Sequence, residues 1–429
     1  MIVDRSASLA RRSFGRQGLR GFGALWLATS ATNLADGLVQ LTLPILAARA
    51  TSAPAAVAAV GVAATTPWLL FALPVGVLAD RADRRMLMLG ANALRAAALL
   101  LLASLVITEA MSLPALYGVA FILGTAETIA DTTAQSILPT VVEGKRLERA
   151  NARLIGAQTV ANQFVGPPLG GLLIAASAAL AIGTSAGLYL VAVPLLWLLR
   201  GAFRPAPTGS LRLRQDIEAG LRFLAGHRLL RTLALFVFVM NVGWGAWYAL
   251  LVLYAVAPGP LGLSEAGYGL LLTAMGVGGV LGTTVAVPLQ RLIGSRWAIA
   301  ADLLGTVTML GMPALTTNPW LIAASIIGGG AGSAMWSIVV TSIRQQAAPD
   351  AMLGRVTSAF RLCGFAGPTL GAAAGGALAE VVGLRPVFAA CAVLSTLLLI
   401  PFIRIVTDTE LRSARQTPRP DAIWEGGIR

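Results

Sequence analysis

The sequence has few charged residues: Asp, Glu, Lys and Arg make up only 12% of it. A soluble globular protein usually carries about 25% charged residues. Hydrophobic residues instead reach 56%, and the mean hydropathy is +0.77. These values exclude an ordinary soluble domain.

Residues that commonly carry chemistry are also scarce. The one histidine, His227, lies in a polar linker, and the two cysteines, Cys363 and Cys391, lie in apolar stretches. This is too little for a disulfide framework, and no spacing typical of metal ligands occurs. A G-x-x-x-x-G-K phosphate-binding loop is absent as well, which argues against transport driven by ATP. We therefore expect no catalytic residues, no enzyme activity, no metal and no cofactor.

Long apolar stretches are abundant, and polar breaks separate them. They predict twelve membrane spans, at residues 21–47, 55–79, 86–108, 112–135, 151–175, 178–200, 229–256, 266–289, 297–316, 319–343, 354–379 and 383–406. Lipid offers no partner for backbone N–H and C=O groups, so each span must be helical. The sequence thus predicts an all-α membrane protein with twelve transmembrane helices.

Basic residues concentrate in every second break between these spans and in both terminal segments. The exceptions among the 32 basic residues are Arg49, Arg95 and Arg385. Because basic loops stay in the cytoplasm, both termini are predicted to be cytoplasmic in a multi-pass protein of the bacterial inner membrane. The net charge of +13 is then a topology signal and a contact for anionic lipids, and no nucleic-acid partner is expected.

The chain divides into two similar halves. The stretch Gly166-Pro167-Pro168-Leu169-Gly170-Gly171 has a counterpart in Gly367-Pro368-Thr369-Leu370-Gly371-Ala372. Two six-helix repeats are a transporter design. The predicted parts are a cytoplasmic tail (1–20), a six-helix bundle (21–200), a cytoplasmic linker with an amphipathic helix (201–228), a second six-helix bundle (229–407) and a cytoplasmic tail (408–429).

The break after the second span carries a specific motif. Residues 76–85 read Gly-Val-Leu-Ala-Asp-Arg-Ala-Asp-Arg-Arg, which resembles the signature loop of the major facilitator superfamily. Asp83 stands where that family usually has glycine, which should make the turn more demanding. Residues 33–37 and 218–224 are similar to the macrolide-efflux and enterobactin-exporter-like branch. The resemblance covers residues 18–407 and implies the two-bundle transporter fold.

This loop is a candidate cytoplasmic gate. We expect Asp80 to pair with Arg355, at the positive N-terminal end of the eleventh span, and Arg84 to reach Asp131. Such pairs would hold the two halves together until the transporter changes state. Alternatively, these residues only fix topology and fold. The predicted gate comprises Gly76, Asp80, Arg81, Arg84, Arg85, Asp131 and Arg355.

Ionisable residues within the spans are a sharper functional signal, since burying them is costly. Asp36 and Glu127 are candidates for proton coupling or for contact with a cationic substrate, and Arg95 could hold one of them ionised. A poorly hydrated carboxyl group can exchange a proton near neutral pH, because burial disfavours its charged form. Asp302 is a weaker candidate. The alternative is a static charge network that keeps helices in register.

The family resemblance implies a cavity lined by spans 1, 4, 7 and 10. The predicted lining residues are Asn33, Gln40, Asn162, Gln163, Asn241, Trp244, Tyr248 and Trp336. Such a wall suits an amphiphilic ligand with aromatic groups. Alternatively, Trp244 and Trp336 are anchors at the membrane interface. Gly166, Pro167, Gly170 and Gly171 resemble an exporter-type helix motif. It is incomplete, since Asn162 replaces an earlier glycine, and simple helix packing would also explain it.

Taken together, the residues and the resemblance predict a proton-coupled antiporter that exports hydrophobic or amphiphilic small molecules. Drugs, macrolides and siderophores are the expected substrate types, and multidrug resistance is an expected role. A monomer is expected. An uptake permease on the same fold, or a membrane receptor or scaffold without transport, stays open as an alternative.

Overall fold

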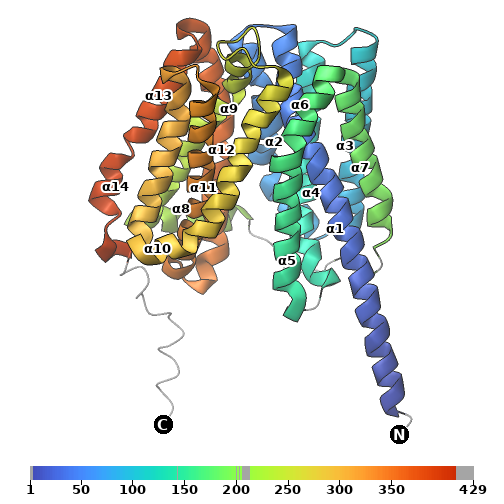
Figure 1. Cartoon of the computed structure of the whole chain (residues 1–429). Coiled ribbons are helices and arrows are strands. Elements are labelled where there is room, and N and C mark those ends of the chain that lie inside the picture. Colours follow the sequence, from blue (N-terminus) through green and yellow to red (C-terminus); the bar gives the residue numbers. More distant parts are fainter. Residues whose placement is uncertain (1–2, 143, 200, 202, 205–212, 412–429) are drawn as a thin grey trace. The chain divides into compact units, whose positions relative to one another are not determined.

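The computed structural model describes residues 3–142, 144–199, 201, 203–204 and 213–411. This part of the chain is helical apart from short connections, and its only strand-like pairing is an isolated bridge between Val256 and Leu263 (Figure 1). The predicted all-helical fold is therefore confirmed. Part of the predicted linker, 205–212, and most of the predicted C-terminal tail, 412–429, lie outside the described residues.

The helices follow one another with short connections. In chain order they are α1 (Val3–Ala50), α2 (Pro54–Ala79), α3 (Arg84–Ile107), α4 (Leu113–Val141), α5 (Gly144–Thr159), the π-helix η1 (Val160–Val165), α6 (Gly166–Ala176), α7 (Ala178–Trp197), α8 (Leu213–Gly226), α9 (Arg228–Ala255), α10 (Glu265–Leu315), α11 (Pro319–Ala347), α12 (Asp350–Val382), α13 (Leu384–Thr396) and α14 (Leu399–Ile405).

Ten helices in the described residues are long and apolar enough to cross a membrane. They match ten of the predicted spans one for one. The two remaining predictions, 21–47 and 151–175, fall on α1 and on the continuous series α5, η1 and α6. The twelve-span architecture predicted from hydropathy agrees with this arrangement.

Two breaks in the helices have clear local causes. Gly294 interrupts α10 with a φ of 83°, a backbone conformation that favours glycine, and so separates the predicted eighth and ninth spans. The last span breaks between α13 and α14. Pro401 has no N–H group to donate to the carbonyl of Leu397, so the regular helix cannot continue through this turn.

The chain forms two compact units. The N-terminal unit comprises Met1–Leu46, Thr66–Leu211 and Glu265–Gly269, and the C-terminal unit comprises Ala47–Thr65, Arg212–Ser264 and Leu270–Arg429. In the N-terminal unit α3 packs on α7 and α4. In the C-terminal unit α9 packs most extensively on α12, and also on α13.

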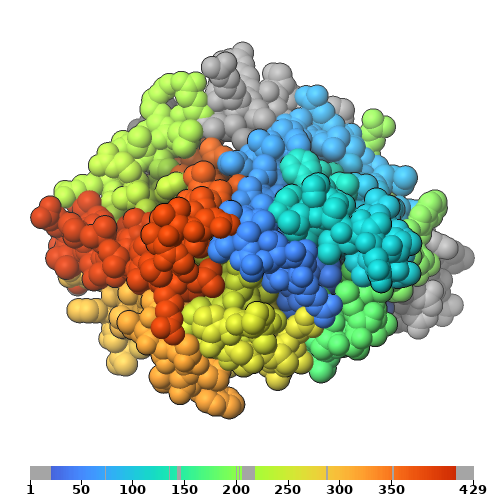
Figure 2. All heavy atoms as spheres, turned by 90° about the horizontal axis from the view of Figure 1, so that it is seen from above, coloured from blue at the N-terminus to red at the C-terminus, as the bar shows by residue number. Residues whose placement is uncertain are grey.

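The start of α2 belongs to the C-terminal unit. The backbone N–H of Ala55 donates a hydrogen bond to Glu380 on α12 (3.0 Å), and the hydroxyls of Thr369 and Thr65 are hydrogen-bonded (2.8 Å). On the face seen in Figure 2, the start of α2, in blue, lies directly against the end of α12, in orange-red. The division into units therefore cuts through α2, whereas the predicted bundles kept this span whole.

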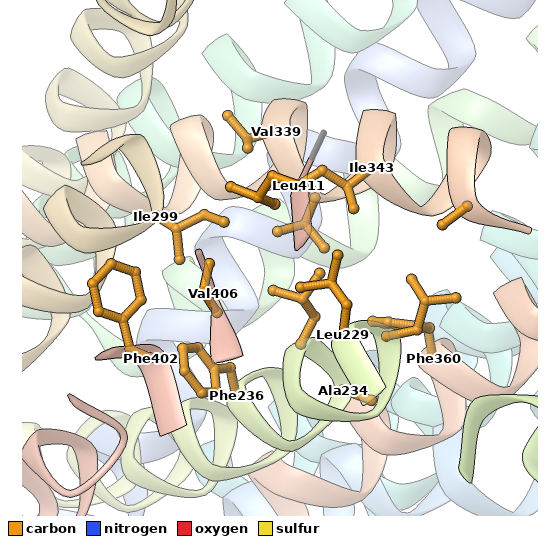
Figure 3. Close-up of a cluster of buried hydrophobic side chains, with 14 of the residues drawn as sticks. Leu229, Ala234, Phe236, Ile299, Val339, Ile343, Phe360, Phe402, Val406 and Leu411 are labelled. Carbon is orange, nitrogen blue, oxygen red and sulfur yellow. The ribbon is translucent and has the colours of Figure 1, made fainter. Parts of the chain in front are cut away.

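The C-terminal unit has a large apolar core. Leu229 and Phe236 of α9 meet Ile299 of α10, Ile343 of α11 and Phe360 of α12, all of them buried (Figure 3). Lipid tails are as apolar as leucine, so close fit holds these side chains together within a membrane more than exclusion of water does.

Candidate functional site: a buried charge cluster in the N-terminal unit

Asp36 lies on α1 and is the centre of a buried polar cluster. Its side chain accepts a hydrogen bond from the hydroxyl of Tyr189 on α7, at 2.5 Å. A guanidinium nitrogen of Arg95 on α3, Nη1, lies 3.4 Å from the same carboxylate oxygen. Three helices distant in sequence therefore meet at one carboxylate.

Arg95 is the cation of this cluster. It is fully buried, and its guanidinium lies over the ring of Tyr189, 5.1 Å from the ring centre. Neither Nη1 nor Nη2 makes a hydrogen bond of good geometry. A buried arginine with unused donors is costly unless carboxylates compensate its charge. The burial of the Arg95 charge therefore depends on the acids around it.

Two further acids extend the cluster on α4. Glu127 and Asp131 are one helical turn apart, and both interact electrostatically with Asp36 and Arg95. The indole of Trp68 donates a hydrogen bond to Glu127. Glu127 and Asp131 are partly exposed, whereas Arg95 is buried. The predicted trio of Asp36, Glu127 and Arg95 thus comes together, and Asp131, which was assigned to the gate, joins it.

Some members of this site were not predicted from the sequence. Tyr189 and Trp68 were missed, as was the buried hydrogen bond from Thr32 on α1 to Asn92 on α3, at 3.2 Å. A usable signal existed for Tyr189, because a tyrosine in the middle of a span needs a partner for its hydroxyl. Nothing in the sequence indicated that this partner is Asp36.

The π-helix η1 packs against α1 next to Asp36. The segment η1 contains Asn162 and is followed, after Gly166, by Pro167 and Pro168, which cannot donate backbone hydrogen bonds to the preceding turn. A Cβ atom added to Gly37 would lie 2.7 Å from the Asn162 carbonyl oxygen, so glycine lets α1 touch this turn. Gly37, the residue after Asp36, therefore allows α1 to cross the π-helix η1 in direct backbone contact.

The exporter-type motif acts in helix packing. A Cβ atom on Gly166 would lie 2.7 Å from Gly37 Cα, and one on Gly171 would lie 2.6 Å from the Glu265 carbonyl oxygen. At Gly170 the nearest atom, Cα of Leu38, is at 3.4 Å. Small residues at this motif thus permit close approach of helices, as the packing interpretation expects.

The signature loop ties together helices of its own unit. Arg84 donates to the Ser136 carbonyl at the end of α4 (2.8 Å), one turn beyond the expected partner Asp131. Arg85 donates to the Leu199 carbonyl (2.9 Å) and lies 4.8 Å above the Trp197 ring. These contacts fit the interpretation that the two arginines fix the fold.

The remaining predicted gate residues are Gly76, Asp80, Arg81 and Arg355. Asp80 lies 3.7 Å from Arg84, and Arg81 is exposed. A Cβ atom on Gly76 would meet nothing within 4 Å. Arg355 lies on α12 in the C-terminal unit, and its pairing with Asp80 stays a prediction.

Asp83 does not strain the turn, contrary to expectation. Its φ of −67° is ordinary, and its carboxylate caps α3 by accepting hydrogen bonds from the N–H groups of Arg85 and Met86. An acid at a helix N-terminus is favourable. The departure from the family pattern therefore has a local structural role.

The residues predicted to line a cavity differ in environment. Trp244, Trp247 and Tyr248 form a series of ring contacts on α9, whereas Trp336 stacks on Phe236 beside the apolar core, with ring centres 6.2 Å apart. Asn33 and Asn241 donate to carbonyls of their own helices, Asn162 is half-buried, and Gln40 and Gln163 are exposed. Their role in a cavity stays a prediction.

Helices that cross the membrane and a polar charge cluster buried among them are the features of a secondary transporter. The sequence model described as "Transmembrane secretion effector" matches residues 16–423, so the chain belongs to this family of the major facilitator superfamily. Transporters of this superfamily carry small molecules and are not enzymes. The chain is accordingly a multi-pass membrane transporter.

Similar proteins agree with this assignment. The enterobactin exporter EntS of Escherichia coli O1:K1 / APEC is 28% identical over 401 residues, which cover 92% of this chain and 94% of EntS. EntS of Escherichia coli O6:K15:H31 (strain 536 / UPEC) is 27% identical over the same lengths.

Solved structures share the fold at low sequence identity. The nucleoside transporter NupG (D323A mutant) matches with a TM-score of 0.74 and 12% identity, covering 90% of this chain and 100% of NupG. A bacterial homologue of the iron transporter ferroportin in the inward-facing state matches with a TM-score of 0.68 and 18% identity. The match covers 91% of this chain and 98% of the ferroportin homologue.

Proposed function

We propose that this chain is an antiporter that exports a hydrophobic or amphiphilic small molecule in exchange for protons. Alternating access of the two units would carry the substrate across the bacterial inner membrane. The charge balance of the buried cluster is the observation that carries this proposal.

The cluster contains more acids than bases. Asp36, Glu127 and Asp131 interact with one another and with Arg95, the one basic residue among them. Arg95 offsets one negative charge, so up to two would be left at membrane depth if every acid were ionised. Uncompensated charges there are expensive. Protons or a cationic substrate would neutralise them, and exchange between the two is the basis of antiport.

The direction of transport is supported by the relatives. Enterobactin exporters match over nearly the whole chain, and the family is described as secretion effectors. Basic residues at the chain ends and in every second loop support cytoplasmic termini and contacts with anionic lipid headgroups. We propose a monomer, since each unit supplies its own core.

The aromatic residues of α9 support the proposed substrate class. Trp244 and Tyr248 flank the buried Trp247, with ring centres 6.5 and 6.4 Å from it. Flat rings next to polar groups such as Asn241 suit a drug, macrolide or siderophore, all of which combine apolar area with polar atoms. Activity on several unrelated drugs would make the protein a multidrug transporter.

Proton coupling is testable with purified protein. Addition of a transported ligand to weakly buffered protein should release protons, detected with a pH-sensitive dye. Asp36→Asn and Glu127→Gln should remove this release, and Glu148→Gln, at an exposed position on α5, should not. Release of equal size in both cluster variants would refute the roles of Asp36 and Glu127.

Export itself needs a separate measurement. Inside-out vesicles should accumulate a fluorescent amphiphilic dye when a proton gradient is imposed, and an uncoupler should abolish this accumulation. Accumulation only in right-side-out vesicles would establish an uptake permease instead. Absence of flux in both orientations, for dyes, macrolides and siderophores alike, would favour a receptor or scaffold.

A further inference from the structure

A lone acid lies in the core of the C-terminal unit. Asp302 is on the second half of α10 and is 2% exposed. Its Oδ2 atom has no hydrogen-bond partner in the described part of the chain. Within the residues that the structure describes, it forms no ion pair.

A second unsatisfied oxygen lies one turn away on the same face of α10. Thr306 is fully buried, and its hydroxyl has no partner in the described chain. Buried polar atoms are almost always hydrogen-bonded. Two exceptions four residues apart therefore need an explanation.

On the side of Asp302 that faces Gly332, packing leaves no space for a longer side chain. A Cβ atom on Gly332 of α11 would lie 2.7 Å from Asp302 Cα and 2.9 Å from Oδ1, and one on Gly305 would lie 2.6 Å from the Gly328 carbonyl oxygen. Apolar neighbours on α10, Ile299 and Leu303, are fully buried. The glycines thus bring α10 and α11 into direct backbone contact around the acid.

Charged residues of this unit have other contacts or lie elsewhere. Arg296 lies over the Phe402 ring, and Arg344 over the Phe360 ring. None of the charged residues described on the helices of this unit forms an ion pair with Asp302; they are Arg49, Glu218, Arg222, Arg228, Arg231, Arg291, Arg296, Arg344, Arg355, Arg361, Glu380, Arg385, Arg404, Asp408 and Glu410.

We propose that Asp302 is a second proton-binding site, separate from the N-terminal cluster, and that its carboxyl group is protonated when α10 and α11 are in contact. An ionised carboxylate without a partner at this depth would be strongly unfavourable. A metal cation gathers several oxygen ligands, whereas the described residues offer two unsatisfied side-chain oxygens here, so a proton fits better. Loss of the proton would place a bare charge at the glycine contact and favour separation of the two helices.

The sign of the pH dependence follows from proton binding. The folded protein holds a proton at Asp302 that an unfolded aspartate lacks near neutral pH. Since the folded state then binds more protons, stability falls as the pH rises. In the variant Asp302→Asn the amide cannot ionise, so its contribution to stability is the same at every pH.

The test is thermal unfolding of the full-length protein in lipid nanodiscs between about pH 6 and pH 9. The Tm of the unsubstituted protein should fall by about 3 °C more than that of Asp302→Asn. Asp408→Asn, at an exposed position after α14, is the matched control and should follow the unsubstituted protein.

Other outcomes would overturn the proposal. Identical pH profiles for Asp302→Asn and the unsubstituted protein would do so, as would failure of Asp302→Asn and Asp302→Ser to fold, because a neutral acid tolerates neutral replacements. A higher Tm at about pH 9 in sodium chloride than in choline chloride would assign the site to sodium. None of these readouts depends on export or on the N-terminal cluster, so the two proposals fail separately.

Discussion

In the N-terminal unit Asp36 meets Arg95 and Tyr189, with Glu127 and Asp131 nearby, whereas Asp302 of the C-terminal unit lies against Gly332 and forms no ion pair among the described residues. Both units nevertheless use the same kind of helix crossing. A Cβ atom on Gly166 would lie 2.7 Å from Gly37 on α1, and one on Gly367 would lie 2.5 Å from the Cβ of Asn241 on α9. The duplicated motif therefore preserves packing while the buried charges have diverged.

The largest expected effect on stability comes from removing the buried cation. Arg95→Met leaves Asp36 and its neighbouring acids without compensation, and we expect a loss of about 3–5 kcal/mol in unfolding free energy. Thermal unfolding in nanodiscs measures it. The double variant Arg95→Met, Asp36→Asn should recover part of the loss, and additive losses would show that the two side chains are not coupled.

The shared helix crossing should be sensitive in both units. Gly166→Ala and Gly367→Ala each force backbone or Cβ atoms apart, and we expect about 1–3 kcal/mol of destabilisation from overpacking. Gly187→Ala is the control, because nothing lies within 4 Å of its added Cβ and alanine favours helix. Unchanged Tm values in the first two variants would contradict the close packing.

Two buried tyrosines, Tyr189 and Tyr254, allow a hydrogen bond to a carboxylate to be compared with a hydrogen bond to a neutral carbonyl. Tyr189→Phe removes a donor to a carboxylate and should cost about 2 kcal/mol, whereas Tyr254→Phe removes a donor to the Thr316 carbonyl and should cost about 1 kcal/mol. Urea or thermal unfolding of both variants tests the order. Equal losses would show that the hydrogen bond to Asp36 is no stronger than one to a neutral carbonyl.

The smallest effect on stability is expected at the signature loop. Asp80 is half exposed and pairs with Arg84 at 3.7 Å, so Asp80→Asn should change the unfolding free energy by less than about 1 kcal/mol. If Asp80 is part of a gate, the variant should reach the membrane in normal amounts yet lose transport. Normal transport would leave the loop with a structural role alone, and loss of the protein would indicate a folding role.

The sequence predicted most of the charged residues of the site, but it did not predict which of them contact one another. Asp36, Arg95 and Glu127 stand out because charges within apolar spans are rare. The residues that these charged side chains contact could not be predicted from the sequence. Arg84 bonds to a backbone carbonyl, which every residue possesses, and Tyr189 meets Asp36 across an interval of 153 positions. Helical periodicity gives the face of a residue but not the neighbour that this face meets.

The helices and their order can be read from the amino-acid sequence, because lipid permits no other backbone structure along apolar stretches of about 20 residues. The sequence also indicates where close crossings are possible, through Gly166 and Gly367. The three-dimensional packing is needed to see that Arg95 pairs with Asp36 and that Asp302 has no cation beside it among the described residues. The physical reason is that pairing depends on distances of a few ångströms between helices, which hydropathy and spacing along one chain do not contain.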